Sequence, residues 1–174
     1  MTDRTVDVEP EADKATPDGF RSMMSGFPSG VGVVTSTGHD GAPRGMTCSS
    51  VSSVSLDPPT LLVCLRHGSP TLEAILERGT FAVNLLHEGA QEVAKLFASG
   101  NPERFRMTPW EQATDAGGPH LVDDAHTIAD CDVVMTHRTG DHVTVFGEAR
   151  LITRRHAVAP LLYGLREFRA WSRI

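Results

Sequence analysis

The sequence predicts one mainly β domain, in which an antiparallel sheet closes into a barrel and short helices pack on its outside. Two pairs of strand-like segments are each separated by a short turn sequence, which is typical of β-hairpins. The long crossover helices that a parallel sheet needs are not visible in the pattern. About six or seven strands result, and closing their sheet would remove its unpaired edges.

The first part of the chain predicts a helix, a hairpin and a buried strand. Apolar residues in Gly19–Gly30 recur at spacings of three and four, which favours a short helix. Residues 31–50 read as two strands around an Asp-Gly turn at 40–41. The double proline at 58–59 ends the second strand, because proline has no amide donor for the ladder. The continuous apolar run 60–66 predicts a strand buried on both faces.

Two helices and a strand follow. Residues 69–79 begin with serine and proline and end with glycine, the usual order of an N-cap, a first turn and a helix end. Residues 80–86 predict a strand. Residues 89–99 predict an amphipathic helix, with the inward residues Val93, Leu96 and Phe97.

The last third predicts a loop, a second hairpin and a less regular end. Residues 101–119 have a weak pattern, so we expect a loop with a short helical turn and a strand near Trp110. Residues 127–138 and 142–154 alternate and form a hairpin across a Thr-Gly-Asp turn. Residues 160–171 predict a short helix or an irregular segment.

Composition narrows the class of protein. The chain has 174 residues and a net charge of −6 without a Lys/Arg run, which argues against nucleic-acid binding. Its three cysteines are widely spaced, so neither a disulfide framework nor a structural zinc site is expected, and a reducing cytoplasm fits. No apolar stretch approaches the roughly 18 residues of a membrane helix. Residues 1–17 are acidic and predict a flexible tail before one domain at 18–174.

The segment Met46–Ser55 is unusually rich in hydroxyl groups for a strand in the middle of a sheet. Neither of its two alternating faces is cleanly apolar, and the doubled Ser-Ser-Val breaks the alternation, which indicates a bulge. Buried hydroxyls without partners cost about 1–3 kcal/mol each, so the side chains must find partners. A flat ligand ending in phosphate would provide them. The alternative is that these serines bond to neighbouring backbone or face water.

A second polar cluster follows in the sequence CLRHGSPT, at the start of the helix 69–79. Arg66 carries a full charge, the helix start offers unpaired N–H groups, and Ser69 and Thr71 add hydroxyls. This combination suits a phosphate group. Plain capping by Ser69 beside a solvated arginine is the alternative.

Six motifs occur in an order that resembles the flavin reductase-like domain family. They span Phe20 to Phe168 and read FRSMMSGFPSGVGVVTS, DGAPRGMTCSSVSSVSLDPPTLLVCL, SPTLEAIL, FAVNLL, GDHVTVFGEA and PLLY. The resemblance implies an FMN-binding split β-barrel, a homodimer, and bound FAD or FMN. It also implies hydride transfer from NADH or NADPH to the flavin, and release of the reduced flavin to a separate flavin-dependent oxygenase.

The resemblance also implies which residues contact the cofactors. The flavin residues would be Arg44, Gly45, Met46, Thr47, Ser49 and Ser50 along the ring, Cys64, Leu65 and Arg66 on the next strand, Ser69 and Thr71 near the phosphate, and Leu96 and Phe97 on the helix. His142, in the GDH motif, would lie near the nicotinamide and shape its pocket; a turn histidine at a dimer contact is the alternative. Tyr163 would be a further nicotinamide contact, whereas Arg166 departs from the position of the arginine found in many relatives.

Other classes of site have little support. The histidines are scattered without metal-ligand spacing, and no metal site is expected. The GxGxxG motif of dinucleotide-binding folds is absent, so a nicotinamide must bind by another route. Two alternatives to an enzyme remain at this point: a module that stores or senses flavin without turnover, and a barrel used for protein interaction.

Overall fold

The computed structural model describes residues 14–155 and 158–171, which form a mainly β structure with short helices. The helices are α1 (Pro17–Ser25), α2 (Pro70–Arg78), α3 (Gln91–Ala98) and α4 (Arg104–Met107). The strands are β1 (Ser29–Gly30), β2 (Gly32–Thr37), β3 (Pro43–Cys48), β4 (Ser52–Leu56), β5 (Pro59–Arg66), β6 (Thr80–Leu86), β7 (Ala125–Thr139), β8 (His142–Arg154), β9 (Leu161–Gly164) and β10 (Glu167–Ala170). The predicted mainly β class with short helices is confirmed.

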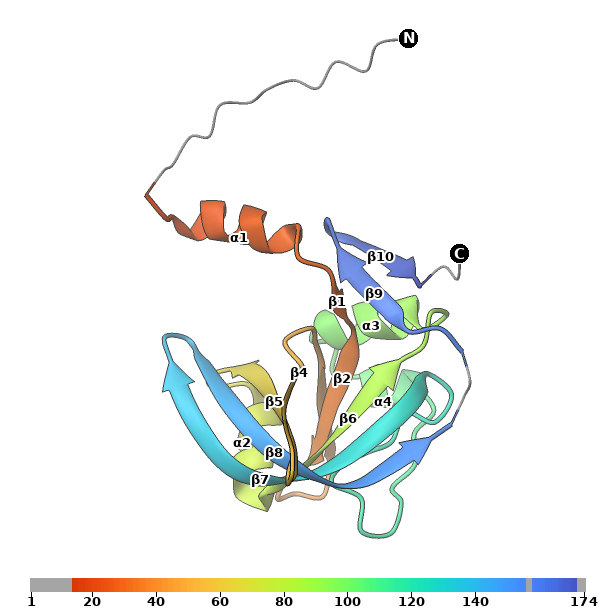
Figure 1. The fold of residues 1–174 in the computed structure, drawn as a ribbon. Helices are drawn as coiled ribbons and strands as arrows, with labels where there is room; N and C mark the ends of the chain where they lie inside the picture. Colours follow the sequence, from red (N-terminus) through yellow and green to blue (C-terminus); the bar gives the residue numbers. More distant parts are fainter. Residues whose placement is uncertain (1–13, 156–157, 172–174) are drawn as a thin grey trace.

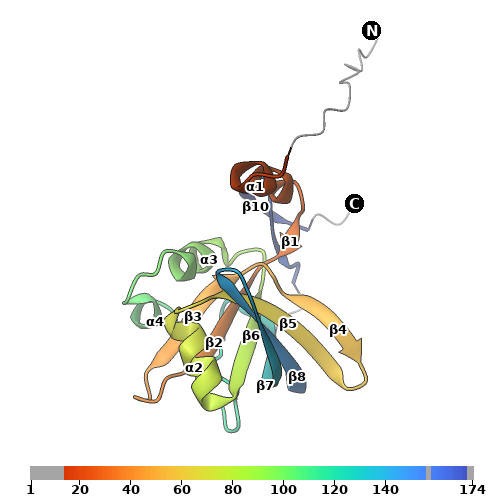
Figure 2. The same ribbon diagram turned by 90° about the vertical axis from the view of Figure 1, so that its left-hand side faces the viewer.

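The main sheet has seven antiparallel strands in the order β3-β2-β6-β7-β8-β5-β4. It curves strongly (Figures 1 and 2). The helix α2 packs on the face of β2 that carries Val34, whereas α3 packs on the opposite face, which carries Val33. The expected closure of the barrel is wrong, because the edge strands β3 and β4 are not hydrogen-bonded to each other. They are consecutive in the chain but pair with strands at opposite ends of the sheet.

The hydroxyl-rich segment is not one strand, which corrects the prediction for Met46–Ser55. β3 ends at Cys48 and pairs with β2, whereas β4 begins at Ser52 and pairs with β5. Residues 49–51 cross between the two ends of the sheet. The predicted irregularity lies farther along, where the pairing of β4 shifts between Ser53 and Ser55. The prolines at 58–59 follow the end of β4, as predicted.

The strand β5 is not buried on both faces, contrary to the expectation for residues 60–66. Val63 and Leu65 are fully buried in the core, while Cys64 between them is only half-buried and Arg66 is exposed. The burial therefore alternates as in an ordinary strand with one core face. The prediction was wrong because Leu61 and Leu62, which belong to the continuous apolar run, are only half-buried.

The C-terminal segment is a hairpin rather than a helix or an irregular end. β9 pairs with β10 and, on its other side, with the two-residue strand β1, which makes a separate three-stranded sheet. The turn residues Leu165 and Arg166 have positive φ values of 51° and 62°. The backbone N–H of Leu165 donates to the carbonyl of Ser25 at 2.6 Å, which fixes this turn against the end of α1.

The helices follow their sequence signals. Ser69 caps α2 by accepting from the N–H of Leu72, and Gly79 ends the helix in the left-handed conformation with φ 70°. Thr16 caps α1, so this helix begins inside the range that the sequence assigns to a flexible tail. Residues 1–13 of that tail lie outside the described residues. No helix among residues 14–155 and 158–171 is long and apolar enough to cross a membrane.

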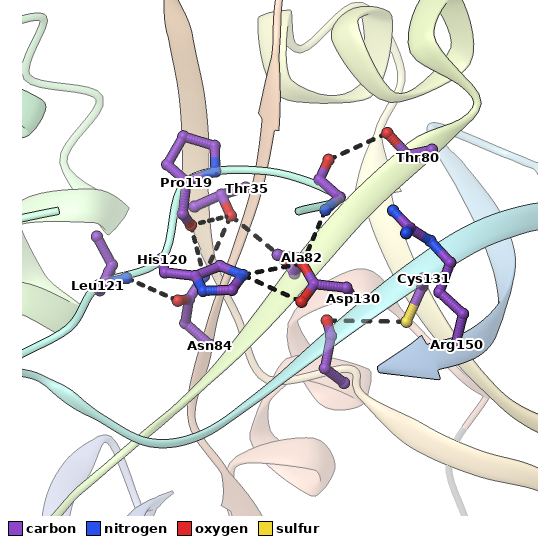
Figure 3. Close-up of polar contacts among 12 residues, drawn as sticks. Thr35, Thr80, Ala82, Asn84, Pro119, His120, Leu121, Asp130, Cys131 and Arg150 are labelled. Atoms are coloured by element: carbon purple, nitrogen blue, oxygen red, sulfur yellow. Dashed lines mark hydrogen bonds and ion pairs between the residues drawn. The ribbon is translucent and has the colours of Figure 1, made fainter. Parts of the chain in front are cut away.

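Buried polar side chains on β6 and β7 form hydrogen bonds to the loop before β7 (Figure 3). The Asp130 carboxylate accepts from the Gly117 N–H at 2.7 Å and contacts His120 Nε2 at 2.9 Å. Asn84 donates to the carbonyls of Val33 and Pro119 and accepts from the Leu121 N–H. The predicted irregular stretch 101–119 contains α4, and Glu111 near Trp110 makes a single bridge to His120.

Candidate functional site

A cavity of about 470 Å³ lies where β3, α3 and the β9–β10 hairpin meet. It combines hydroxyl groups, apolar and aromatic side chains, and one cation; the lining residues are Val31, Thr47, Ser49, Lys95, Ala98, Ser99, Tyr163 and Phe168. We call it the strand cavity. Three of the residues predicted for cofactor binding, Thr47, Ser49 and Tyr163, therefore come together from two distant parts of the sequence.

The position of α3 over β3 gives the strand cavity its wall. Thr47 Oγ1 donates to the carbonyl of Ala94 at 2.6 Å, which ties the strand to the helix. At Gly45, an added Cβ would lie 2.9 Å from Phe105 and 3.2 Å from Phe97. Glycine is needed at this position because the aromatic rings under the helix approach the backbone so closely.

Aromatic rings support both sides of this wall. Phe97 and Phe105 make an edge-to-face contact with centroids 5.0 Å apart. Tyr163 and Phe168, which line the strand cavity from the hairpin, have their centroids 5.0 Å apart. The site thus has a rigid aromatic frame around an opening lined by small hydroxyls.

The hydroxyls of the crossing segment have two different roles. Ser50 Oγ accepts from the Cys64 N–H at 3.0 Å and donates to the Cys64 carbonyl at 3.1 Å, so it replaces a ladder partner for β5. This is the backbone-bonding role that the sequence left open for these serines. Ser49 is exposed, has no hydrogen bond among the described residues, and lines the strand cavity. Its hydroxyl is therefore available to a ligand.

A second group of predicted residues lies where β5 and β8 end. Arg66 and His142 are directly opposite each other in the pairing of these strands. His142 Nδ1 lies 2.9 Å from the Asp141 carboxylate, and this hydrogen bond lowers the pKa of Asp141. Ser69 follows at the start of α2, where its hydroxyl is used as the cap. Neither Arg66 nor His142 lines the strand cavity.

Several predicted residues present no free side chain at the surface. Leu65 and Thr71 are 0% and 2% exposed, and Phe97 is 2% exposed, so these residues have almost no surface that a ligand could reach. Met46 packs against the same core cluster as Leu65. Core packing in the single chain, rather than ligand contact, accounts for the side chains of these residues.

Arg44 and the predicted inward face of α3 also differ from expectation. Arg44 lies at the turn end of β3 and pairs with the Asp40 carboxylate at 2.7 Å. The buried residues of α3 are Ala94 and Phe97, whereas Val93 and Leu96 are only half-buried. Val93 and Leu96 line a second cavity, which adjoins the strand cavity.

The sequence did not single out several lining residues of the strand cavity, namely Val31, Lys95, Ala98, Ser99 and Phe168. Lys95 is the cation of the site and pairs with Glu92 at 2.8 Å, one turn earlier on α3. Its place on the polar face of an amphipathic helix was the only signal that it points away from the core. Among the described residues, no group of three His, Cys, Asp or Glu side chains could hold a metal ion.

Residues 24–172 match the family model described as "Flavin reductase like domain". The chain belongs to this family. It is 44% identical to a flavin reductase (NADPH) from Lentzea aerocolonigenes, over 97% of this chain and 98% of the relative. It is 35% identical to the reductase subunit HsaB of a flavin-dependent monooxygenase from Mycobacterium tuberculosis, over 83% of this chain and 75% of the relative.

A solved structure of the family supports the same fold. The NADH:FAD oxidoreductase SgcE6 of Streptomyces globisporus C-1027, in complex with NAD and FAD fragments, matches with a TM-score of 0.84 and 31% identity. The match covers 92% of this chain and 98% of that chain. The flavin reductase-like architecture indicated by the six sequence motifs is therefore confirmed for nearly the whole chain.

The residues of the strand cavity fit a flavin. A volume of about 470 Å³ is within the range of roughly 300–1,000 Å³ typical of small-molecule sites. Val31, Tyr163 and Phe168 can contact a flat ring, while the unpartnered hydroxyl of Ser49 and the ammonium group of Lys95 suit polar or charged groups of a ligand. The donors and apolar surfaces that a phosphorylated ring system needs are thus present in one place.

Proposed function

We propose that this protein is an NAD(P)H:flavin oxidoreductase that supplies reduced flavin to a separate flavin-dependent monooxygenase. The observation that carries the proposal is the strand cavity, in which Thr47, Ser49 and Tyr163 meet in a chain that belongs to the flavin reductase-like family. The relatives named above are flavin reductases, and one of them is the reductase subunit of a monooxygenase.

In this proposal FAD or FMN binds in the strand cavity. Ser49 donates or accepts a hydrogen bond at the polar edge of the ring, and Lys95 attracts the phosphate. Thr47 contributes indirectly: its hydroxyl is already used by the Ala94 carbonyl and holds α3 in place. Small side chains along β3 leave room for a ring where larger ones would fill the cavity.

A flavin bound here would accept hydride from NADH or NADPH, and the protein's part is to orient the two rings. Such positioning can supply several kcal/mol of the barrier. Tyr163 offers an aromatic face at the mouth of the strand cavity. His142 and Arg66 offer polar groups at the ends of β8 and β5 for the nicotinamide or its phosphates. No side chain is assigned the role of an essential proton donor.

The proposed function is tested by mixing the purified protein with NADH or NADPH and either FMN or FAD without oxygen. We expect rapid loss of the visible absorbance of the oxidised flavin with stoichiometric loss of the reduced nicotinamide. Flavin binding without nicotinamide oxidation would instead identify a storage or sensor module. Absence of both would overturn the proposal and leave an interaction barrel. The same assay ranks the two flavins and the two donors.

His142→Ala is expected to raise the KM for NADH several-fold while leaving the Kd for FMN unchanged. The imidazole is half-exposed beside Asp141 and lies outside the strand cavity, so its loss affects the nicotinamide side alone. Stopped-flow reduction at varied NADH, with FMN binding measured separately, gives the two constants. His39→Ala, in the exposed β2–β3 turn, is the matched control. Unchanged KM and turnover for His142→Ala would remove this residue from the site.

The protein also fits a homodimer, because α1 carries an apolar face without a partner in the single chain. Phe20, Met23 and Met24 in α1, and Phe27 just after it, are 58%, 62%, 43% and 68% exposed. The spacing of three and four residues places the three helix residues on one side of α1. Figure 1 shows α1 standing away from the curved sheet, next to the β9–β10 hairpin. Exposed apolar surface of this kind marks an interface, and in the proposed dimer a second copy covers it.

Met24→Asp is expected to convert the proposed dimer to a monomer, because a carboxylate would be buried without a partner in the interface. Light scattering coupled to size-exclusion chromatography gives the mass directly. Ser22→Asp introduces the same charge on the opposite face of α1 and should leave the mass unchanged. A wild-type mass of a single 18.8 kDa chain would contradict the proposed dimer.

A cytoplasmic location suits this function, because the donors and the oxygenase partner are then in the same compartment. Cys48, Cys64 and Cys131 form no disulfide, which is the usual state of cysteines in a reducing compartment. Burial raises the pKa of the Cys131 thiol to about 12, and burial also raises the pKa of Cys48. Both thiols therefore remain protonated and unreactive.

A further inference from the structure

A second cavity, of about 480 Å³, lies between α3 and the end of α4 and adjoins the strand cavity. We call it the helix cavity; its lining residues are Glu92, Val93, Lys95, Leu96, Ser99, Met107 and Thr108. Lys95 and Ser99 line both cavities. The two spaces are therefore neighbours that share one cation and one hydroxyl.

We infer that the helix cavity binds the adenosine diphosphate half of a dinucleotide whose redox ring lies in the strand cavity, an inference that rests on the proposed function. FAD and NAD(P)H each consist of a redox ring system and an adenosine, joined through a pyrophosphate. Two cavities of similar volume with a shared lysine between them match that arrangement. The pyrophosphate would cross α3 at Lys95 and Ser99.

The shared lysine can take a pyrophosphate at low cost, whereas Ser99 would have to exchange an existing hydrogen bond to donate to it. Lys95 is about half-exposed and its present partner, Glu92, is 84% exposed. Such a surface ion pair contributes little to stability, so exchanging the carboxylate for a phosphate loses little. Ser99 Oγ donates to the carbonyl of Leu96 at 2.8 Å. Its oxygen also accepts from the Asn101 N–H, which holds the hydroxyl at the boundary of the two cavities.

The helix cavity has the chemistry of a purine site. Val93, Leu96 and Met107 provide apolar contacts for a flat base. The Glu92 carboxylate can accept from the exocyclic amine of adenine, which is a hydrogen-bond donor. These groups lie beside the lysine that would bind the phosphates, as the structure of an adenosine diphosphate requires.

Thr108 is an independent sign that this cavity is incomplete. The residue is 4% exposed, and its hydroxyl has no hydrogen-bond partner among the described residues. A buried hydroxyl left in this state is destabilising, because it has lost its hydrogen bonds to water and gained none in the protein. The hydroxyl is shielded in the present rotamer, and a rotation about χ1 is the motion that would present it to a ring nitrogen of the base.

The test compares whole and half ligands by titration calorimetry: FAD against FMN, and NAD⁺ against nicotinamide mononucleotide. Thr108→Val keeps the side-chain shape and removes only the unpartnered hydroxyl, so the fold is preserved. Met107→Trp starts from a 62% exposed residue and fills the cavity from its rim. Thr136→Val, at an exposed position of β7, is the matched control.

We expect Thr108→Val to weaken binding of one dinucleotide by about threefold to tenfold, the net effect of one hydrogen bond. Met107→Trp should weaken it by about tenfold or more, and the matching mononucleotide should stay within about twofold in both variants. A weaker affinity for FAD would assign the helix cavity to the flavin, and a weaker affinity for NAD⁺ would assign it to the nicotinamide donor. The inference would be overturned if both variants bound all four ligands with wild-type affinity. It would also be overturned if a dinucleotide and its mononucleotide half lost affinity equally. Failure of the wild-type protein to bind or reduce either FMN or FAD would instead overturn the proposed function.

Discussion

Asp130→Ala is expected to lower the free energy of unfolding by about 3–5 kcal/mol. The carboxylate is fully buried and holds both the Gly117 N–H and His120 Nε2 (Figure 3). Its removal leaves two buried polar groups without a partner, and the loop before β7 is released from the sheet. Urea denaturation followed by circular dichroism measures the change.

Asp132→Ala is the matched control for this prediction, since it removes the same side chain two residues later on β7. Asp132 is 53% exposed and pairs with Arg150 at 3.0 Å, so its loss should cost less than about 1 kcal/mol. Asp130→Asn keeps an acceptor for the Gly117 N–H and should be less destabilising than alanine. Equal stability of Asp130→Ala and Asp132→Ala would show that the buried network does not hold the loop.

Ser49→Trp is expected to abolish most flavin binding, with a Kd for FMN raised by more than about tenfold, or roughly 1.4 kcal/mol. Ser49 is exposed, has no hydrogen bond among the described residues and lines the strand cavity, so an indole ring would enter the cavity without disturbing the core. Calorimetric titration with FMN gives the Kd, and anaerobic flavin reduction should fall in parallel.

The variant His39→Trp adds the same ring to the exposed β2–β3 turn and serves as the control. It should bind FMN as the wild type does. The account would be contradicted if Ser49→Trp were folded, with an unchanged urea midpoint, and still bound FMN with wild-type affinity. In that case the ring of the flavin would lie outside the strand cavity.

Local signals in the sequence predicted the elements that depend on local physics. Ser69, Pro70 and Gly79 mark both ends of α2, and the alternation around Gly140 predicts the long β7–β8 hairpin. The C-terminal hairpin was missed because its turn uses Leu165 and Arg166 at positive φ, where glycine or asparagine is the usual signal. Its partner β1 has only two residues, which is too short for a pattern.

The error about the hydroxyl-rich segment arose because strands pair with partners that are distant in the sequence. The segment Met46–Ser55 looks like one strand in the sequence, but its halves pair with β2 and β5 at opposite ends of the sheet. Ser50 makes this crossing possible by bonding to both backbone groups of Cys64. No residue pattern within the segment reveals this partner, which is 14 residues away.

The candidate site was only partly predictable for a related reason. The family motifs pointed to Thr47, Ser49 and Tyr163, and the structure brings these three to one cavity. Lys95 and Ser99 were missed because helical periodicity identifies the core face of α3 but not what its polar face meets. Leu65 and Thr71 were expected at the ligand, yet their side chains belong to the core. Burial is a property of the whole fold and is not visible in one motif.

A crystal structure of the protein with FMN or FAD tests the central claim most directly. The account predicts electron density for the isoalloxazine ring in the strand cavity, with a polar contact to Ser49 and the aromatic face of Tyr163 nearby. A ring bound at a different surface, or a strand cavity without density for the ring at saturating flavin, would contradict it.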